Sequence, residues 1–140
     1  MLYITKEDYD AIVAWAREHL PEEACGLLGG TTGDNGDKYV KKVYFIENTD
    51  HSNEHFTISP NQQLKAILDL RKNGLKMLGN WHSHPESPSR PSEEDKRLAL
   101  DPSLLYLILS LMEEEPVLNA FVIDSEKNVS REEINVLSEF

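Results

Sequence analysis

Residues 75–95 read LKMLGNWHSHPESPSRPSEED, a stretch that decides the fold because it joins an apolar strand to a helix through a rigid loop. The apolar run predicts a buried strand that ends near His84. The three prolines within residues 85–91 prevent regular structure in the loop. Ser92, with Asp95 three residues later, is typical of a capped helix start. The order strand, loop, short helix is therefore expected here.

Outward from this stretch, apolar periodicity and turn formers divide the chain into helices and strands. Apolar residues recur at helical spacing after Thr5 and after Ser59, and these runs stop before Pro21 and Gly74. Shorter runs bounded by Gly, Asn and Asp predict strands. The expected helices cover residues 5–20, 59–74 and 92–100, and the expected strands cover 24–29, 39–46, 56–58, 75–84, 104–111, 117–123 and 129–137. This order indicates an α+β fold, with helices packed on a mixed, mostly antiparallel sheet.

Size and charge exclude several classes of protein. A chain of 140 residues predicts one domain, residues 1–140. Fourteen basic and 25 acidic residues give a net charge of −11, so nucleic acid is a poor candidate partner. The longest apolar run, residues 104–112, is too short to span a membrane, and no signal peptide is visible, so we expect a cytoplasmic protein. The single cysteine, Cys25, excludes a cysteine-based zinc site and is expected in the core.

The histidines carry the strongest chemical signal. His82 and His84 lie two residues apart on an expected strand, so their side chains share one face at a spacing of about 6.6 Å. Two imidazoles at that spacing can bind one metal ion, and Asp95 could fold back as a third ligand. Three protein ligands leave one position for water, which is typical of a catalytic zinc site.

Other interpretations of these residues remain open at this stage. Ser92 and Asp95 also form a capping box, which stabilises a helix by about 0.5–2 kcal/mol without any metal. Residues 51–55, HSNEH, match the H-x-x-E-H pattern of another zinc-protease class. That pattern needs a helix, and the surrounding turn formers predict none. We expect His19, near the end of the first helix, to interact favourably with the helix dipole and to face solvent.

Residues 21–29, PEEACGLLG, combined with the His-x-His and Ser-x-x-Asp pattern of residues 82–95, resemble the motif of the JAMM (MPN+) zinc metalloproteases. The resemblance spans essentially the whole chain. The short chain is similar to the compact prokaryotic and archaeal members, because the long insertions of larger eukaryotic members are absent. The family fold implied by the resemblance is a curved sheet flanked by helices, similar to that of cytidine deaminases.

The resemblance also implies a role for each motif residue. His82, His84 and Asp95 match the ligands of one Zn²⁺ ion that holds a catalytic water. Glu23 matches the glutamate that acts as general base and acid, and the adjacent Glu22 is its nearest rival. Ser92 matches the serine that stabilises the tetrahedral intermediate.

The function implied by the resemblance is cleavage after the Gly-Gly tail of a ubiquitin-like protein, such as a small archaeal modifier or a bacterial sulfur carrier. The alternative is an inert MPN scaffold or protein-binding module, although such relatives usually lack the ligands. A deaminase is excluded because its P-C-x-x-C ligands are absent. The sequence leaves open the ubiquitin-like partner, the choice between isopeptide and linear peptide bonds, and the formation of a homodimer.

Overall fold

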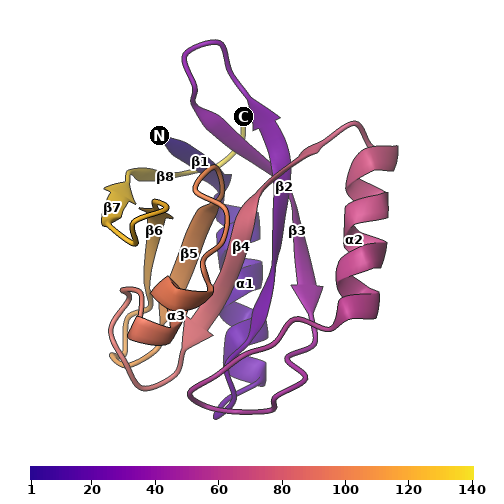
Figure 1. Cartoon of the computed structure of the whole chain (residues 1–140). Helices are drawn as coiled ribbons and strands as arrows, with labels where there is room; N and C mark the ends of the chain where they lie inside the picture. The colour runs from indigo at the N-terminus through magenta and orange to yellow at the C-terminus, as the bar shows by residue number, and fades with distance from the viewer.

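The computed structural model describes all residues from 1 to 140 and contains one mixed sheet with three helices (Figure 1). In chain order the elements are β1 (Leu2–Thr5), α1 (Lys6–Glu18), β2 (Cys25–Thr32), β3 (Lys38–Ile46), α2 (Pro60–Lys72), β4 (Lys76–His84), α3 (Glu93–Leu98), β5 (Leu105–Ser110), β6 (Val117–Ile123), β7 (Val129–Glu132) and β8 (Ile134–Leu137). The strand order is β7-β6-β5-β4-β2-β3-β1-β8. Four strand pairs are antiparallel and three are parallel. The predicted α+β class and the mixed, mostly antiparallel sheet are confirmed.

The sheet is strongly curved. β7 and β8 occupy its two opposite edges, yet only Glu133 separates them in the chain. Because consecutive Cα atoms are about 3.8 Å apart, these edges lie within about 8 Å of each other at this point. The sheet therefore curls around α1, whose buried Ile12, Val13 and Ala16 belong to the main hydrophobic cluster.

β2 lies between two hydrophobic clusters, one on each of its faces. Leu28 packs in the cluster with α1, whereas Leu27 packs with Ile46 and with Ala66 of α2. Alternate residues of a strand point to opposite faces, so α1 and α2 cover opposite sides of the sheet. Figure 1 shows α2 standing outside the curl beside β3.

The helix starts agree with the sequence analysis. Thr5, Ser59 and Ser92 cap α1, α2 and α3, and each side chain accepts a hydrogen bond from a backbone N–H of the first turn. The last helix is shorter than expected, because it ends at Leu98. None of the three helices has both the length and the apolar composition that a membrane crossing requires.

Three expectations about strands were wrong. Residues 2–5 form β1, with buried Leu2 and Ile4, although the sequence analysis assigned no strand there. Residues 129–137 form two strands rather than one, because β7 pairs with β6 while β8 pairs in parallel with β1. The expected strand at 56–58 contributes only an isolated bridge between Asn48 and Ile58.

Candidate metal and reaction centre

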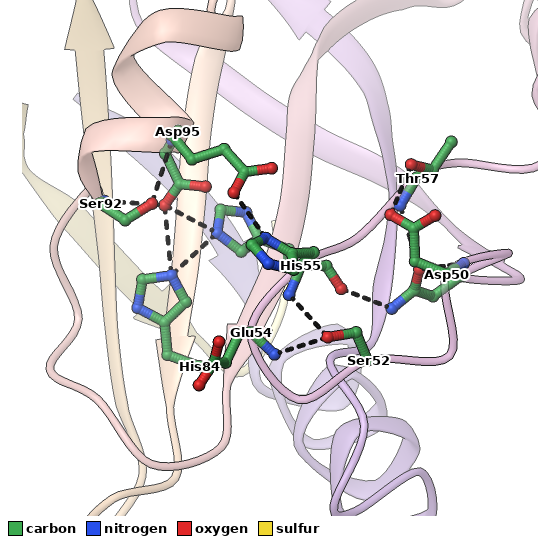
Figure 2. Close-up of polar contacts among 11 residues, drawn as sticks. Asp50, Ser52, Glu54, His55, Thr57, His84, Ser92 and Asp95 are labelled. Carbon is green, nitrogen blue, oxygen red and sulfur yellow. Dashed lines mark hydrogen bonds and ion pairs between the residues drawn. The ribbon is translucent and has the colours of Figure 1, made fainter.

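The three predicted metal ligands meet at one point. His82 and His84 are buried on one face of β4, and Asp95 lies in the first turn of α3. Nε2 of His82 and Nε2 of His84 are 3.1 Å apart, and Oδ2 of Asp95 lies 3.2 Å from each (Figure 2). β4 places the two histidines on one face, and the loop after β4 brings Asp95 back to them. The three potential ligand atoms therefore form a triangle.

The size of this triangle fits a zinc ion. Tetrahedral ligands with bonds of about 2.0–2.1 Å lie about 3.3 Å from one another. Nδ1 of His84 donates to the carbonyl oxygen of Pro88 at 2.8 Å, so in the neutral ring Nε2 carries a lone pair. That lone pair faces a carboxylate oxygen of Asp95, which is also an acceptor. A cation or a proton between the two atoms removes the repulsion, and the hydrogen bond to Pro88 is the outer contact typical of a metal-binding histidine.

The protonation states of the three residues suit metal binding. Burial lowers the pKa of His82 below its usual range. Burial also lowers the pKa of His84, but contacts with Asp95, Pro88 and Glu23 outweigh it and leave the pKa above its usual value. Burial opposes the charge on Asp95, yet hydrogen bonds from both imidazoles hold the pKa of this carboxyl well below its usual range. An ionised aspartate and a neutral His82 are the forms that bind a metal ion, and a cation would displace the extra proton on His84.

The proline-rich loop that leads to Asp95 is fixed against β5. The hydroxyl of Ser110 donates to the carbonyl oxygen of Ser87, and the hydroxyl of Ser89 donates to that of Ile108, both at 2.6 Å. Asp95 is then oriented by the capping box, since its Oδ2 accepts from the backbone N–H of Ser92 at 2.9 Å. The loop is irregular but has a defined position.

Glu23 lies beside the two histidines and is 4% exposed. A carboxylate oxygen of Glu23 and the ring nitrogens of His82 and His84 all lie within 4.8 Å of one another. This distance also makes Glu23 a geometric rival for the third ligand position, but the contacts of Asp95 with both rings are shorter. Burial raises the pKa of Glu23 to about 8, partly offset by the nearby His84. Its carboxylate makes no hydrogen bond, so it is free to contact water or substrate.

The backbone around Glu23 is tied to β4. The backbone N–H of the next residue, Ala24, donates to Oγ of Ser83 at 2.8 Å, and the N–H of Ser83 donates to the carbonyl oxygen of Ala24 at 2.9 Å. Ser83 is the middle residue of His-x-His and points away from the two imidazoles. Glu22 points toward His51 at 3.3 Å. The side chains of Glu22 and Glu23 therefore point in different directions. Strand alternation is not the cause, because both residues precede β2 and neither lies on a strand.

Ser92 and Glu23 share a polar cleft of about 260 Å³. The cleft is lined by Glu23, Asn53, Glu54, His84, Glu86, Ser87 and Ser92. Oγ of Ser92 accepts a hydrogen bond from the backbone N–H of Asp95 at 3.0 Å, so its hydroxyl proton remains available to an acceptor in the cleft. Ser92 caps α3 whether or not it has a second role.

A second, mostly apolar cavity of about 510 Å³ adjoins His82 and Asp95. Its apolar lining includes Phe56, Ile58, Leu98, Leu100 and Ile108. The ring of Phe56 stacks on that of His82, with centroids 4.4 Å apart and planes inclined by 22°. Nδ1 of His82 is buried without a hydrogen-bond partner, so packing orients this ring. The sequence analysis missed the role of Phe56, although an aromatic residue within a polar stretch is a usable signal.

The remaining histidines lie elsewhere. His51 and His55 belong to the loop between β3 and α2, where no helix forms, as expected. His51 contacts Glu22, and His55 contacts Glu94 of α3 at 2.5 Å. His19 is half-buried rather than solvent-facing, because its ring packs on Trp15 and its Nδ1 donates to the carbonyl oxygen of that residue at 2.7 Å.

Cys25 is buried, as the sequence analysis expected. Its thiol donates to the carbonyl oxygen of Ile46 at 3.4 Å, and burial raises its pKa to about 12. The thiol is therefore protonated and inert near neutral pH. A larger cavity of about 810 Å³ runs along β3 and is also lined by residues of α1 and α2. Its lining includes Glu23 but neither histidine of the triangle.

Comparison with known proteins shows which proteins this chain is similar to. A protein of Desulfitobacterium hafniense, solved in solution, is 51% identical and superposes with a TM-score of 0.90 over 99% of this chain and 94% of that one. The CysO-cysteine peptidase of Mycobacterium tuberculosis is 29% identical over 111 residues, 79% of this chain and 73% of that protein. The desampylase of Haloferax volcanii is 29% identical over 114 residues, 78% of this chain and 80% of that protein. The profile of the prokaryotic homologues of the JAB domain matches residues 5–124, and the chain therefore belongs to that family, the prokaryotic branch of the JAMM/MPN proteins.

Proposed function

We propose that this protein is a zinc-dependent peptidase that cleaves the amide bond after the Gly-Gly tail of a ubiquitin-like protein. The observation that carries the proposal is the triangle formed by His82, His84 and Asp95, with the buried, unpartnered Glu23 beside it. The similarity to a CysO-cysteine peptidase and to a desampylase supports a substrate of this class.

His82, His84 and Asp95 are the residues that would hold the metal. A Zn²⁺ ion with three protein ligands supplies a Lewis acid and lowers the pKa of its water to about 7. The contribution of the protein is to fix the ligands before the ion arrives. Strand geometry fixes the two histidines, and the capping box fixes the aspartate.

Glu23 is the group positioned to move the proton. In amide hydrolysis, water adds to the carbonyl carbon, the C–N bond breaks, and the departing nitrogen gains the proton that the water gave up. A carboxyl group with a pKa near the working pH can both take and return that proton, and burial raises the pKa of Glu23 to about 8. An inert scaffold would gain nothing from a buried carboxyl group without a partner, since burying one costs stability.

Ser92 supplies a hydrogen-bond donor to the same cleft. The carbonyl oxygen gains negative charge as water adds to it, and a fixed donor stabilises that charge. The hydroxyl of Ser92 already accepts one hydrogen bond and retains its own proton for donation. Loss of one such donor typically lowers the rate by about 10²–10³.

Metal analysis tests the ligand assignment. Protein purified without chelator should contain one zinc ion per chain, and His84→Ala should lose it. Replacement of both His51 and His55 by alanine is the matched control, since the side chains of these histidines pair with Glu22, Glu47 and Glu94, none of which is a predicted ligand. Zinc that survives His84→Ala, or disappears in the control, would refute the assignment.

Activity on a panel of conjugates tests the reaction. The zinc-loaded protein is incubated with ubiquitin, a small archaeal modifier and CysO, each joined through its Gly-Gly tail to an amine, as an isopeptide and as a linear peptide. We expect release of the intact tail, detected by mass. Failure to release any member of the panel would refute the proposed function.

A further inference from the structure

Two cavities of opposite character meet at the triangle of His82, His84 and Asp95. The mostly apolar cavity of about 510 Å³ adjoins His82 and Asp95. The polar cleft of about 260 Å³ contains Glu23 and His84 and has no apolar side chain in its lining. A substrate that crosses the triangle therefore has one half in an apolar environment and the other half in a polar one.

The position of Glu23 decides which half lies in the polar cleft. The departing nitrogen must come within hydrogen-bond reach of the carboxyl group that returns the proton. Glu23 is nine-tenths buried and has no hydrogen-bond partner, and of the two cavities that meet at the triangle only the polar cleft includes it. The amine half of the substrate therefore occupies this cleft, and the acyl half lies on the apolar side.

The cleft has an unbalanced negative charge. Glu54, from the loop after β3, and Glu86, from the loop after β4, line it together with Glu23. Both outer carboxylates are exposed and neither has an ion-pair partner, whereas the neighbouring Glu94 is paired with His55. Figure 2 shows Glu54 beside His84.

No cation balances these two charges. No lysine or arginine lines the cleft. A divalent metal ion would be neutralised by Asp95 and Glu23 together, so the charges of Glu54 and Glu86 would remain.

Given the proposed function, we propose that Glu54 and Glu86 select the amine half of the substrate by its charge. The favoured leaving group is the ε-amine of a lysine in a basic segment of an acceptor protein. A free amino acid is disfavoured, because its α-carboxylate would enter a cleft in which the charges of Glu54 and Glu86 are unbalanced and no lysine or arginine is present. The two residues determine specificity, while Glu23 moves the proton.

The test compares leaving groups that differ by one charge. The panel member that the zinc-loaded enzyme cleaves fastest is joined through its Gly-Gly tail to cysteine as the free acid, to cysteine as the carboxamide, and to a lysine side chain within a basic peptide. We expect kcat/KM to be about tenfold higher for the carboxamide than for the acid at low salt, mainly through KM, and higher still for the lysine conjugate. The difference should shrink in about 1 M salt, where charges are screened within about 3 Å.

Variants assign the selection to the two residues. Glu86→Lys and Glu54→Lys should each reduce or reverse the preference for the carboxamide, with an unchanged melting temperature, because both side chains are exposed and unpaired. Asp34→Lys is the matched control: it makes the same change in charge at the tip of the β2–β3 hairpin, at the end of β2 remote from the cleft, and should keep the wild-type preference.

The outcomes separate the two proposals. Equal cleavage of acid and carboxamide by the wild-type enzyme would overturn the selection by charge and leave the peptidase function standing. A preference that persists in both glutamate variants, or that changes equally in the control, would also overturn it. Cleavage of no conjugate would overturn the function and the selection together.

Discussion

At the scale of single residues, Glu23 is held by its backbone and not by its side chain. Its N–H donates to the carbonyl oxygen of Ser52 at 2.7 Å, and its carbonyl oxygen accepts from the side-chain amide of Asn48 at 3.0 Å. The carboxylate makes no hydrogen bond within the protein. The carboxylate of Glu23 can therefore be replaced without breaking the backbone hydrogen bonds that hold this segment.

Glu23→Gln should separate chemistry from structure. The amide keeps the shape of the side chain but cannot take a proton, so turnover should fall by about 10²–10⁴. Zinc content and melting temperature should stay close to wild type, because no contact is lost. Steady-state kinetics, metal analysis and thermal unfolding on one preparation check this. Normal turnover would remove Glu23 from the reaction, and loss of zinc would make it a ligand.

Ser92→Asp should separate capping from catalysis. Aspartate caps helices as well as serine does, so α3 should persist and the protein should stay folded with zinc bound. The hydroxyl donor is lost and a negative charge is added where the substrate oxygen becomes negative, so we expect a fall in kcat of at least about 10². Full activity in this variant would mean that Ser92 only caps the helix.

At the scale of elements, Asp69 ties α2 to β3. One carboxylate oxygen accepts hydrogen bonds from Nζ of Lys42 at 2.5 Å and from the hydroxyl of Tyr44 at 2.7 Å. These contacts, with that of Lys42 the largest, lower the pKa of Asp69 below its usual value. Contacts that favour the ionised form in the folded state stabilise that state only while the carboxyl group is ionised.

Asp69→Asn should therefore lower the melting temperature in a pH-dependent way. The folded-state pKa is lowered, so the stabilisation is fully present above the unfolded value of about 3.9 and is lost as the pH falls through the folded value. We expect a gap between wild type and variant at pH 7 that narrows below about pH 4. Asp34→Asn, at an exposed turn residue without a hydrogen-bond partner, is the control. A gap that is constant with pH would rule out the charge as the cause.

The elements also show what a sequence can predict and what it cannot. The three helices were found because their signals are local: a capping side chain and apolar periodicity. Residues 129–137 were misassigned because a strand is defined by its partners, and the two halves of this run pair at opposite edges of the sheet. β1 was missed for the same reason, since its partners are β3 and the distant β8.

The candidate site likewise has features that the sequence predicts and features that it does not. The convergence of His82, His84 and Asp95 follows from strand alternation, a short rigid loop and a helix cap, all of which are visible in the sequence. The stacking of Phe56 on His82 and the approach of Glu54 to the cleft depend on how the loop between β3 and α2 folds back. That loop has no periodicity, so the sequence contains no local signal for its path.

At the scale of the whole molecule, the curved sheet depends on its last strand. β8 pairs in parallel with β1 along its full length, from Leu2 opposite Ile134 to Thr5 opposite Leu137. Leu2 and Ile4, both fully buried, lie on the strand that this pairing covers.

Deletion of residues 134–140 should uncover β1 and destabilise the fold. We expect the melting temperature to fall by about 10 °C, which corresponds to roughly 3 kcal/mol for a chain of this size. The exposed edge should also promote self-association. Deletion of residues 138–140 leaves β8 intact and should have a small effect. Thermal unfolding and gel filtration measure both, and equal behaviour of the two deletions would contradict the role of β8.

The pair of hydrogen bonds between Ala24 and Ser83 has a consequence for protein engineering. These bonds tie the segment that carries Glu23 to the strand that carries the two histidines, while the residues that line the cleft come largely from loops. The side chains of the loop between β3 and α2 that line the cleft, such as those of Asn53 and Glu54, can therefore be exchanged for those of relatives, while the backbone of Ser52, which accepts the hydrogen bond from Glu23, is kept in place. New substrate preferences can be grafted onto this scaffold one loop at a time, with the catalytic rate constant as the measure of whether the centre remains intact.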